Sequence, residues 1–158
     1  HAVLIDIGTT TLVFALVNMK TMSIVFTYAS INRQRNYGSD IMSRINAAGE
    51  GALSDMQIMI REDIHKGINV LKEHAFSAGD PDNISSVFIA GNTTMLHILR
   101  GRDITALGTY PFSPVTLEKE VFFMENKAVT ILPGISAFAG RKEARGGLRG
   151  SECGPQGD

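Results

Sequence analysis

The sequence predicts an α/β fold: one lobe built on a mixed five-stranded sheet in the order 3-2-1-4-5, with helices packed on it. Three observations carry this prediction. Three apolar runs divided by turns open the chain. A long segment with one apolar stripe follows, and two further strands of buried type flank a short helix. Right-handed crossovers through the helices then place the later strands beside the first one.

The N-terminal strands are the clearest pattern. Residues 2–7 are apolar except for Asp6, residues 8–11 form a Gly/Thr turn, and residues 12–17 are apolar again. Two runs rich in β-branched residues around such a turn predict a hairpin. Residues 22–31 are predicted as a third strand, because apolar and polar side chains partly alternate there.

Two helices are predicted next. Asp40 is placed to cap the first one, and Gly49 and Gly51 interrupt it. The second helix has apolar residues at spacings of three and four, which form one stripe, and residues 77–81 end it. The stripe residues are Ile41, Ile45 and Ala48 in the first helix and Leu53, Met56, Ile60, Ile64, Ile68, Leu71 and Ala75 in the second.

The later part of the lobe alternates strand, short helix and strand. Residues 87–90 and 128–132 are predicted as buried strands, with a short helix over 95–99. The run 121–124 is a weaker strand candidate, and it is not counted in the five. A hairpin and third strand followed by crossover-connected strands is the arrangement of a ribonuclease-H-like lobe.

The composition changes from Gly140 onward. The last 19 residues contain six Gly, four Lys or Arg and one Leu, and no β-branched residue. Such a segment has nothing to bury, so we expect a lobe over residues 1–140 and a disordered tail over 141–158. The chain has no initiator Met and begins directly in a strand pattern, which suggests a piece of a longer protein.

Bulk properties narrow the class of protein. The formal net charge of −1 gives no overall field that would favour nucleic acid or an anionic membrane as partner. Apolar stretches of about eight residues fall far short of the roughly 20 that span a bilayer, and no signal peptide is visible. Cys153 alone cannot form an internal disulfide or hold an iron–sulfur cluster, so a reducing, cytoplasmic setting is expected.

The first candidate site is the turn of the N-terminal hairpin. Gly8 offers backbone N–H donors without side-chain bulk, as phosphate binding requires. The hydroxyls of Thr9, Thr10 and Thr11 add donors. Asp6, beside the turn, could hold Mg²⁺ directly or through water. The alternative is a plain hairpin in which Asp6 caps local N–H groups.

The second candidate site is Gly91 with the polar run behind it, Asn92, Thr93 and Thr94. A strand that passes through glycine into a helix start is a ready anion site. Asn92 or Thr93 could orient a terminal phosphate or an attacking water. Taken alone, the motif favours a simple N-cap, and beside the first motif the two interpretations become comparable.

A third segment, residues 32–40 followed by Arg44, is rich in arginine and amide side chains. It could close over a ligand or face a partner. Its chemistry favours a solvated connection in which Asp40 caps a helix. The histidines, among them His97, do not have metal-ligand spacing.

Together these segments resemble the ATP-binding domain of the reductive activators of corrinoid proteins. The likeness covers about residues 1–140 and lies mainly in segments 5–11, 29–45, 91–97 and 132–140. The Gly-Asn-Thr-Thr-Met-Leu-His run and the Tyr-Gly-Ser-Asp run are specific to that family. Asp-Ile-Gly-Thr-Thr is shared by the wider actin, sugar kinase and acetate kinase superfamily.

The resemblance implies a parent protein with a plant-type [2Fe–2S] domain outside this chain. That parent would reduce an inactive cob(II)alamin-type corrinoid protein, its partner, to the cob(I) form, and ATP hydrolysis would drive this uphill step. Asp6 and Gly8 to Thr11 would serve phosphate and Mg²⁺, and residues 92–94 would lie near the terminal phosphate. The chain on its own would be inactive.

The sequence departs from the family's pattern in two ways. The family's second half, with a second phosphate loop and the adenine pocket, is absent. After Gly140 the family continues into an apolar helix, whereas this chain has residues 141–144 of different character, as a slipped reading frame would give. Without that helix, Ile135 and Phe138 lack cover, which predicts self-association, most simply as a homodimer.

Two other functions stay open. A lobe of a sugar or acetate-type kinase would share the phosphate hairpin, but it needs a substrate pocket with an acid or base, and no convincing residue follows the fourth strand. A non-catalytic lobe that only docks a corrinoid protein is the other. A Cys-x4-Cys-x2-Cys cluster encoded upstream of residue 1 would favour the activator.

Overall fold

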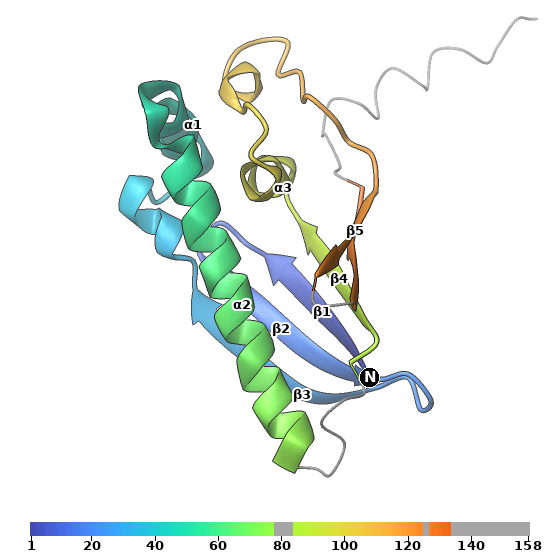
Figure 1. The fold of residues 1–158 in the computed structure, drawn as a ribbon. Coiled ribbons are helices and arrows are strands. Elements are labelled where there is room, and N and C mark those ends of the chain that lie inside the picture. Colours follow the sequence, from blue (N-terminus) through green and yellow to red (C-terminus); the bar gives the residue numbers. More distant parts are fainter. Residues whose placement is uncertain (78–83, 125–126, 134–158) are drawn as a thin grey trace, which may run out of the picture.

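The structure, a computed structural model, describes residues 1–77, 84–124 and 127–133. They form a six-stranded mixed sheet in the order β3-β2-β1-β4-β6-β5. The helices gather on one face of this sheet, and the long α2 lies across β2 and β3 (Figure 1). The strands are β1 Ala2–Ile7, β2 Thr11–Asn18, β3 Ser23–Ile31, β4 Ser86–Gly91, β5 Glu120–Met124 and β6 Lys127–Ile131. The α-helices are α1 Ile41–Ala47, α2 Leu53–Ser77 and α3 Thr93–Arg100, and the short helical turns are η1 Arg33–Tyr37, η2 Ala48–Ala52 and η3 Thr105–Leu107.

The predicted hairpin and third strand are confirmed. β1 pairs antiparallel with β2, with Ile7 opposite Leu12, and β2 pairs antiparallel with β3. β4 runs parallel to β1, with Asp6 opposite Ala90. The C-terminal ends of β1 and β4 therefore lie side by side, and the two predicted site motifs begin there.

The sheet has six strands, so the prediction of five was wrong by one. β6 pairs parallel with β4, at the place predicted for the fifth strand. The extra strand is β5, which pairs antiparallel with β6, from Glu120 opposite Ile131 to Met124 opposite Lys127. Its apolar run is too short to assign from the sequence alone, and the free edge of β6 supplies the hydrogen bonds that make it a strand.

The sheet has a covered face and an open face. Val3, Ile5 and Ile7 of β1 are buried on the helix side, whereas Leu4 and Asp6 alternate with them and are exposed. This period of two follows from strand geometry. The open face thus carries Asp6 among apolar neighbours.

The stripe predicted for the long helix is what packs α2 on the sheet. Along it, Met56, Ile60, Ile64, Ile68, Leu71 and Ala75 are buried. The helix approaches β2 so closely that a Cβ atom on Gly67 would lie 2.3 Å from the ring of Phe14. Gly67 therefore sets how near α2 lies to the sheet.

The predicted caps and breaks around α1 are also confirmed. Asp40 caps α1, and its Oδ1 accepts a hydrogen bond from the Ser43 amide at 2.9 Å. The turn η2 separates α1 from α2, and Gly51 lies there at a φ of 102°, a value that glycine adopts at little cost.

Several predictions fall outside the described residues. These are the disordered tail over 141–158, the apolar pair Ile135 and Phe138, and residues 78–81 beyond the end of α2 at Ser77. Over the described ranges, no helix is both long and apolar enough to cross a membrane.

Candidate functional site

The two predicted motifs meet at one end of the sheet. Gly91 lies opposite Ile7 in the parallel pair of β1 and β4, and a Cβ atom on Gly91 would lie 2.9 Å from the Ile7 carbonyl oxygen. Beyond the strands, Asn92 Nδ2 donates a hydrogen bond to Thr9 Oγ1 at 3.2 Å. The turn after β1 is thus tied directly to the start of α3.

The turn itself requires glycine at its first position. The Gly8 amide donates to the Thr11 carbonyl at 3.0 Å, which closes the turn. A Cβ atom on Gly8 would lie 2.6 Å from that same carbonyl oxygen. The backbone here can come close to a ligand because no side chain stands at Gly8.

The carbonyls at the tip of this turn all accept hydrogen bonds from the segment after β3. Those of Gly8 and Thr10 accept from the Nδ2 and the backbone N–H of Asn32, both at 2.9 Å. The Thr9 carbonyl accepts from the guanidinium of Arg44.

Because a peptide group is planar and trans, each carbonyl points opposite to the next N–H. The N–H groups of Thr9 and Thr10 are therefore directed away from these donors, and no acceptor for either lies in the part of the chain that the structure describes. Adjacent unpaired N–H groups of this kind form an anion-binding concavity, and the Thr10 side chain beside them is exposed. This arrangement can bind phosphate oxygens.

Arg44 is the buried centre of the contacts behind the turn. Its side chain is 0% exposed. Nε donates to the Gly38 carbonyl at 3.0 Å, and Nη1 lies 3.3 Å from Gln34 Oε1 and 3.2 Å from Met95 Sδ. All these acceptors are neutral, and within the described residues no carboxylate forms an ion pair with it. Burial lowers the pKa of this guanidinium from its ordinary value, the Asp40 carboxylate acts in the opposite direction, and arginine keeps its charge in proteins.

The predicted solvated connection over residues 32–40 and Arg44 was wrong in part. The segment folds into η1, and Asn32, Gln34 and Arg44 are each fully buried. The rest of the prediction holds, because Asp40 caps α1 and the segment also has exposed side chains, those of Arg35, Asn36, Ser39 and Asp40. The sequence does hold one signal, because Arg44 lies three residues after Ile41 and so falls on the apolar stripe of α1.

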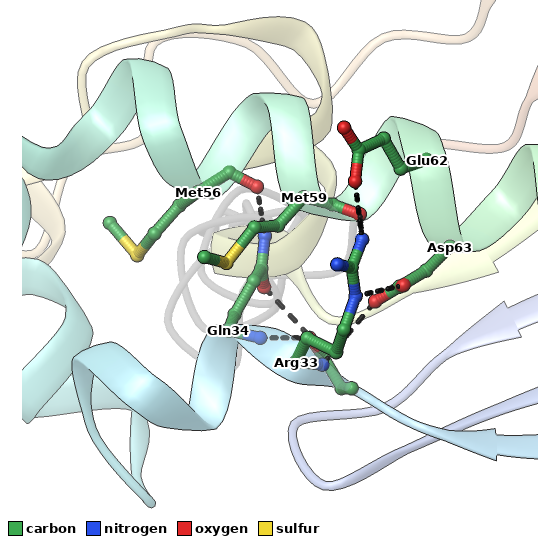
Figure 2. Close-up of polar contacts among 7 residues, drawn as sticks. Arg33, Gln34, Met56, Met59, Glu62 and Asp63 are labelled. Carbon is green, nitrogen blue, oxygen red and sulfur yellow. Dashed lines mark hydrogen bonds and ion pairs between the residues drawn. The ribbon is translucent and has the colours of Figure 1, made fainter.

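The segment is anchored to α2 at two points (Figure 2). Gln34 Nε2 donates to the Met56 carbonyl at 2.9 Å. Arg33 forms ion pairs with Glu62, at 2.7 Å, and with Asp63. The hydrogen bond to Glu62, and then the one to Asp63, raise the pKa of Arg33.

Asp6 lies where the sequence predicted, one residue before the end of β1. Its exposed carboxylate has no hydrogen bond or ion pair within the described ranges. It borders a shallow hollow of about 250 Å³ on the open face, whose other walls include Leu4, Val13 and Phe88. An unpaired carboxylate two residues before the turn fits Mg²⁺, which prefers one or two carboxylates and retained waters. No cluster of three or more His, Cys, Asp or Glu side chains gathers in the described part of the chain.

Asn92 is the N-cap of α3, the simpler of its two predicted roles. Its Oδ1 accepts from the Met95 amide at 2.9 Å while its Nδ2 holds Thr9. Both ends of the amide are thus engaged, which fixes α3 against the turn. Thr93 is partly exposed beside it, whereas Thr94 is buried.

His97 joins α3 to the segment that follows it. The ring is buried, Nδ1 lies 2.8 Å from the Thr93 carbonyl, and Nε2 accepts from the Val115 amide at 3.1 Å. Burial lowers the pKa of this imidazole, which suits a neutral ring that donates at one nitrogen and accepts at the other. Its contacts are structural.

Comparisons with known proteins agree with this geometry. Corrinoid activation enzyme RamQ of Eubacterium limosum is 30% identical over 114 residues, which is 71% of this chain and 19% of that protein. A solved structure described as a reductive activator for corrinoid, iron-sulfur protein matches with a TM-score of 0.74 and 27% identity, over 84% of this chain and 22% of that one. The chain therefore spans about a fifth of the length of these relatives. A family model described as the RACo middle region matches residues 1–142, so the chain belongs to this family, as the resemblance in its sequence indicated.

Proposed function

We propose that residues 1–140 are the first lobe of an actin-like ATP-binding domain in a corrinoid activator. The turn after β1 and the start of α3 then bind the phosphates of Mg-ATP. The observation that carries the proposal is the pair of unpaired N–H groups at Thr9 and Thr10, next to the exposed carboxylate of Asp6. The similarity to proteins named as corrinoid activators favours this function over a sugar or acetate kinase lobe.

Each predicted site residue has a part in this function. Asp6 holds Mg²⁺, which neutralises phosphate charge, while Gly8 and the three threonines after it supply donors. Gly91 permits the close approach of the two strands, and Asn92 keeps α3 against the turn. Thr93 and Thr94, in the first turn of α3, lie near the terminal phosphate.

The whole protein would use this lobe to drive an unfavourable electron transfer. We propose that it accepts electrons from a [2Fe–2S] cluster outside this chain and reduces a cob(II)alamin-type corrinoid protein to the cob(I) form. ATP hydrolysis at the lobe would supply the free energy. The partner is then a cytoplasmic corrinoid protein.

The test is Asp6→Asn in the full-length protein that carries this chain. We expect ATP-dependent corrinoid reduction to be abolished while the fold stays intact, because Asp6 is exposed and has no partner to lose in the described residues. Asp55→Asn, an exposed carboxylate on α2, is the matched control and should keep full activity. Unchanged activation kinetics in Asp6→Asn would remove Asp6 from the site and favour a docking lobe.

The 158-residue chain alone should bind Mg-ATP weakly or not at all. It spans about a fifth of its relatives, so under this proposal the adenine pocket and the second phosphate loop lie elsewhere. Isothermal titration that gave low-micromolar affinity for the isolated chain would contradict this division of the site.

A further inference from the structure

We propose that Arg44 is a positioning residue of this site, and that its buried charge makes the Gly8–Thr11 turn select polyphosphates over singly phosphorylated ligands. The inference rests on the proposed function, because it assigns a preference to the same anion site. It concerns a residue that the phosphate motifs themselves do not include.

No carboxylate in the described residues forms an ion pair with Arg44, and Asp40 acts on its charge only from beyond ion-pair distance. Taking a cation out of water is costly unless an anion or well-placed acceptors offset the loss. Arg44 has acceptors, the carbonyls of Thr9 and Gly38 and the side-chain oxygen of Gln34, and each of them is neutral. The positive charge therefore remains available to an anion nearby.

The position of the Arg44 guanidinium relative to the turn determines which groups its charge affects. The Arg44 guanidinium donates to the Thr9 carbonyl, and the Thr10 N–H leaves the other side of the same planar peptide group. The cation thus lies behind the N–H row, one peptide unit from where an anion would sit. Charges separated by protein rather than water are screened less, and a polarised carbonyl strengthens the N–H on its far side.

Arg33 shows what a structural arginine looks like in the same segment. Its guanidinium is neutralised by Glu62 and Asp63 (Figure 2). If Arg44 served only as a structural connection, a carboxylate at Gln34 would strengthen that connection and leave ligand binding unchanged. If the free charge matters, the same carboxylate would weaken polyphosphate binding.

The experiment is therefore Gln34→Glu in the full-length protein, with ATP, ADP and AMP titrated at one ionic strength. Gln34 Oε1 already faces Arg44 Nη1, so the substitution places an anion there with almost no change of shape. It also removes the hydrogen bond from Gln34 Nε2 to the Met56 carbonyl, a loss that the unfolding measurement records. Arg33→Gln is the matched control, because it alters a charge in the same segment on the side facing α2. Urea unfolding of each variant confirms that it is folded.

We expect Gln34→Glu to lower ATP affinity about tenfold, ADP affinity less, and AMP affinity by less than about twofold, because each added phosphate charge loses the same attraction. Arg33→Gln should leave all three affinities unchanged. An unchanged ratio of ATP to AMP affinity in Gln34→Glu would overturn the role of Arg44 and leave the proposed function standing. A wild-type protein that binds none of the three nucleotides would overturn both.

A second pair of variants covers the case in which Gln34→Glu does not fold. Arg44→Lys keeps the charge and Arg44→Gln removes it, while both lose the planar fork. The ratio of ATP to AMP affinity should stay near the wild-type value in Arg44→Lys and fall in Arg44→Gln. Equal ratios in the two variants would overturn the inference.

Discussion

Arg33 and Arg44 belong to one short segment, and the fold treats them in opposite ways. The Arg33 side chain is 38% exposed and pairs with Glu62 and Asp63 on α2 (Figure 2). Arg44 is fully buried, and the described residues give it only neutral acceptors. One arginine attaches the segment to the helix, and the other holds the turn after β1.

The difference distinguishes an arginine that stabilises the fold from one that supports the candidate site. A paired arginine can be replaced by other contacts, because its charge is already neutralised where it lies. Burying a cation without an ion pair is unfavourable. Arg44 is such a cation, and it lies behind the turn at which we expect a phosphate to bind. The contacts on the side that faces α2 therefore attach the segment to the helix, and those on the side that faces the turn support the candidate site.

The largest loss of stability is expected for Arg44→Met. Methionine fills much of the same volume but removes the donors to the partly buried carbonyls of Thr9 and Gly38, so we expect the free energy of unfolding to fall by about 3 kcal/mol. Urea unfolding of the 158-residue chain, followed by circular dichroism, measures this. Arg35→Met, on the exposed side of η1, is the control and should change little. A loss below about 1 kcal/mol for Arg44→Met would mean that the turn does not depend on this side chain.

The next largest effect is expected at Gly38, whose carbonyl accepts from Arg44. Its φ is 141°, and a Cβ atom there would lie 2.3 Å from the Ser43 Cβ atom. Gly51 provides a matched comparison, because its φ is 102° but nothing lies within 4 Å of the added Cβ atom. Gly51→Ala should cost about 1 kcal/mol from backbone strain, and Gly38→Ala at least about 2 kcal/mol more than that. Equal losses in the two variants would show that α1 moves away freely.

Removing the paired arginine should have a smaller effect. Arg33→Gln breaks an exposed ion pair with Glu62 and leaves the buried carboxylate of Asp63, which is 6% exposed, without its partner. We therefore expect a loss of about 2 kcal/mol at low salt, and less at high salt because salt screens the exposed pair. The same urea titration at two salt concentrations measures it. A loss as large as that of Arg44→Met, or one that salt does not change, would contradict the distinction between the two sites.

The smallest effect is a dependence of stability on pH, which should be stronger for the loss of Arg33 than for the loss of Arg44. The hydrogen bond from Arg33 lowers the pKa of Glu62 below its ordinary 4.5. The folded state then binds fewer protons than the unfolded state, so this stabilisation is present above pH 4.5 and is lost as pH falls through the lower folded pKa.

The stability difference between wild type and Arg33→Gln should therefore shrink as the solution is acidified below that point. The difference between wild type and Arg44→Met should change less, because no carboxylate in the described residues forms an ion pair with Arg44 and its charge is the smallest of the causes that lower the pKa of Asp40. Denaturant titrations over a series of acidic pH values test this. Parallel pH profiles for the two variants would contradict the comparison.

Much of the fold could be predicted because its signals are local. The hairpin of β1 and β2 follows from two β-branched-rich runs around Gly8, and α2 follows from an apolar stripe. The caps at Asp40 and Asn92 follow from a polar residue before a helix, and both are present. β5 was only a weaker candidate and was left out of the five strands, because its assignment depends on the edge of β6, which a short run does not reveal.

The candidate site divides in the same way. The positions of Asp6, Gly8 and Gly91 follow from the sequence, because each of them lies at or next to the end of a predicted strand. Asn92 and Thr9 lie 83 positions apart, and their contact needed the parallel pairing of β1 with β4. Side-chain identity shows which groups are present, and strand pairing shows which groups meet.

By itself, the sequence determined five of the strands, the helical stripe and the two motifs at the strand ends, since periodicity and turn chemistry act between neighbours along the chain. The family followed from the resemblance of those motifs to known proteins. Only the tertiary structure decided that Asn32, Gln34 and Arg44 are buried behind the turn. A polar side chain is stable in the interior only where partners converge on it from distant segments. The carbonyls of Thr9 and Gly38 and the sulfur of Met95 meet around Arg44 only after the chain has folded.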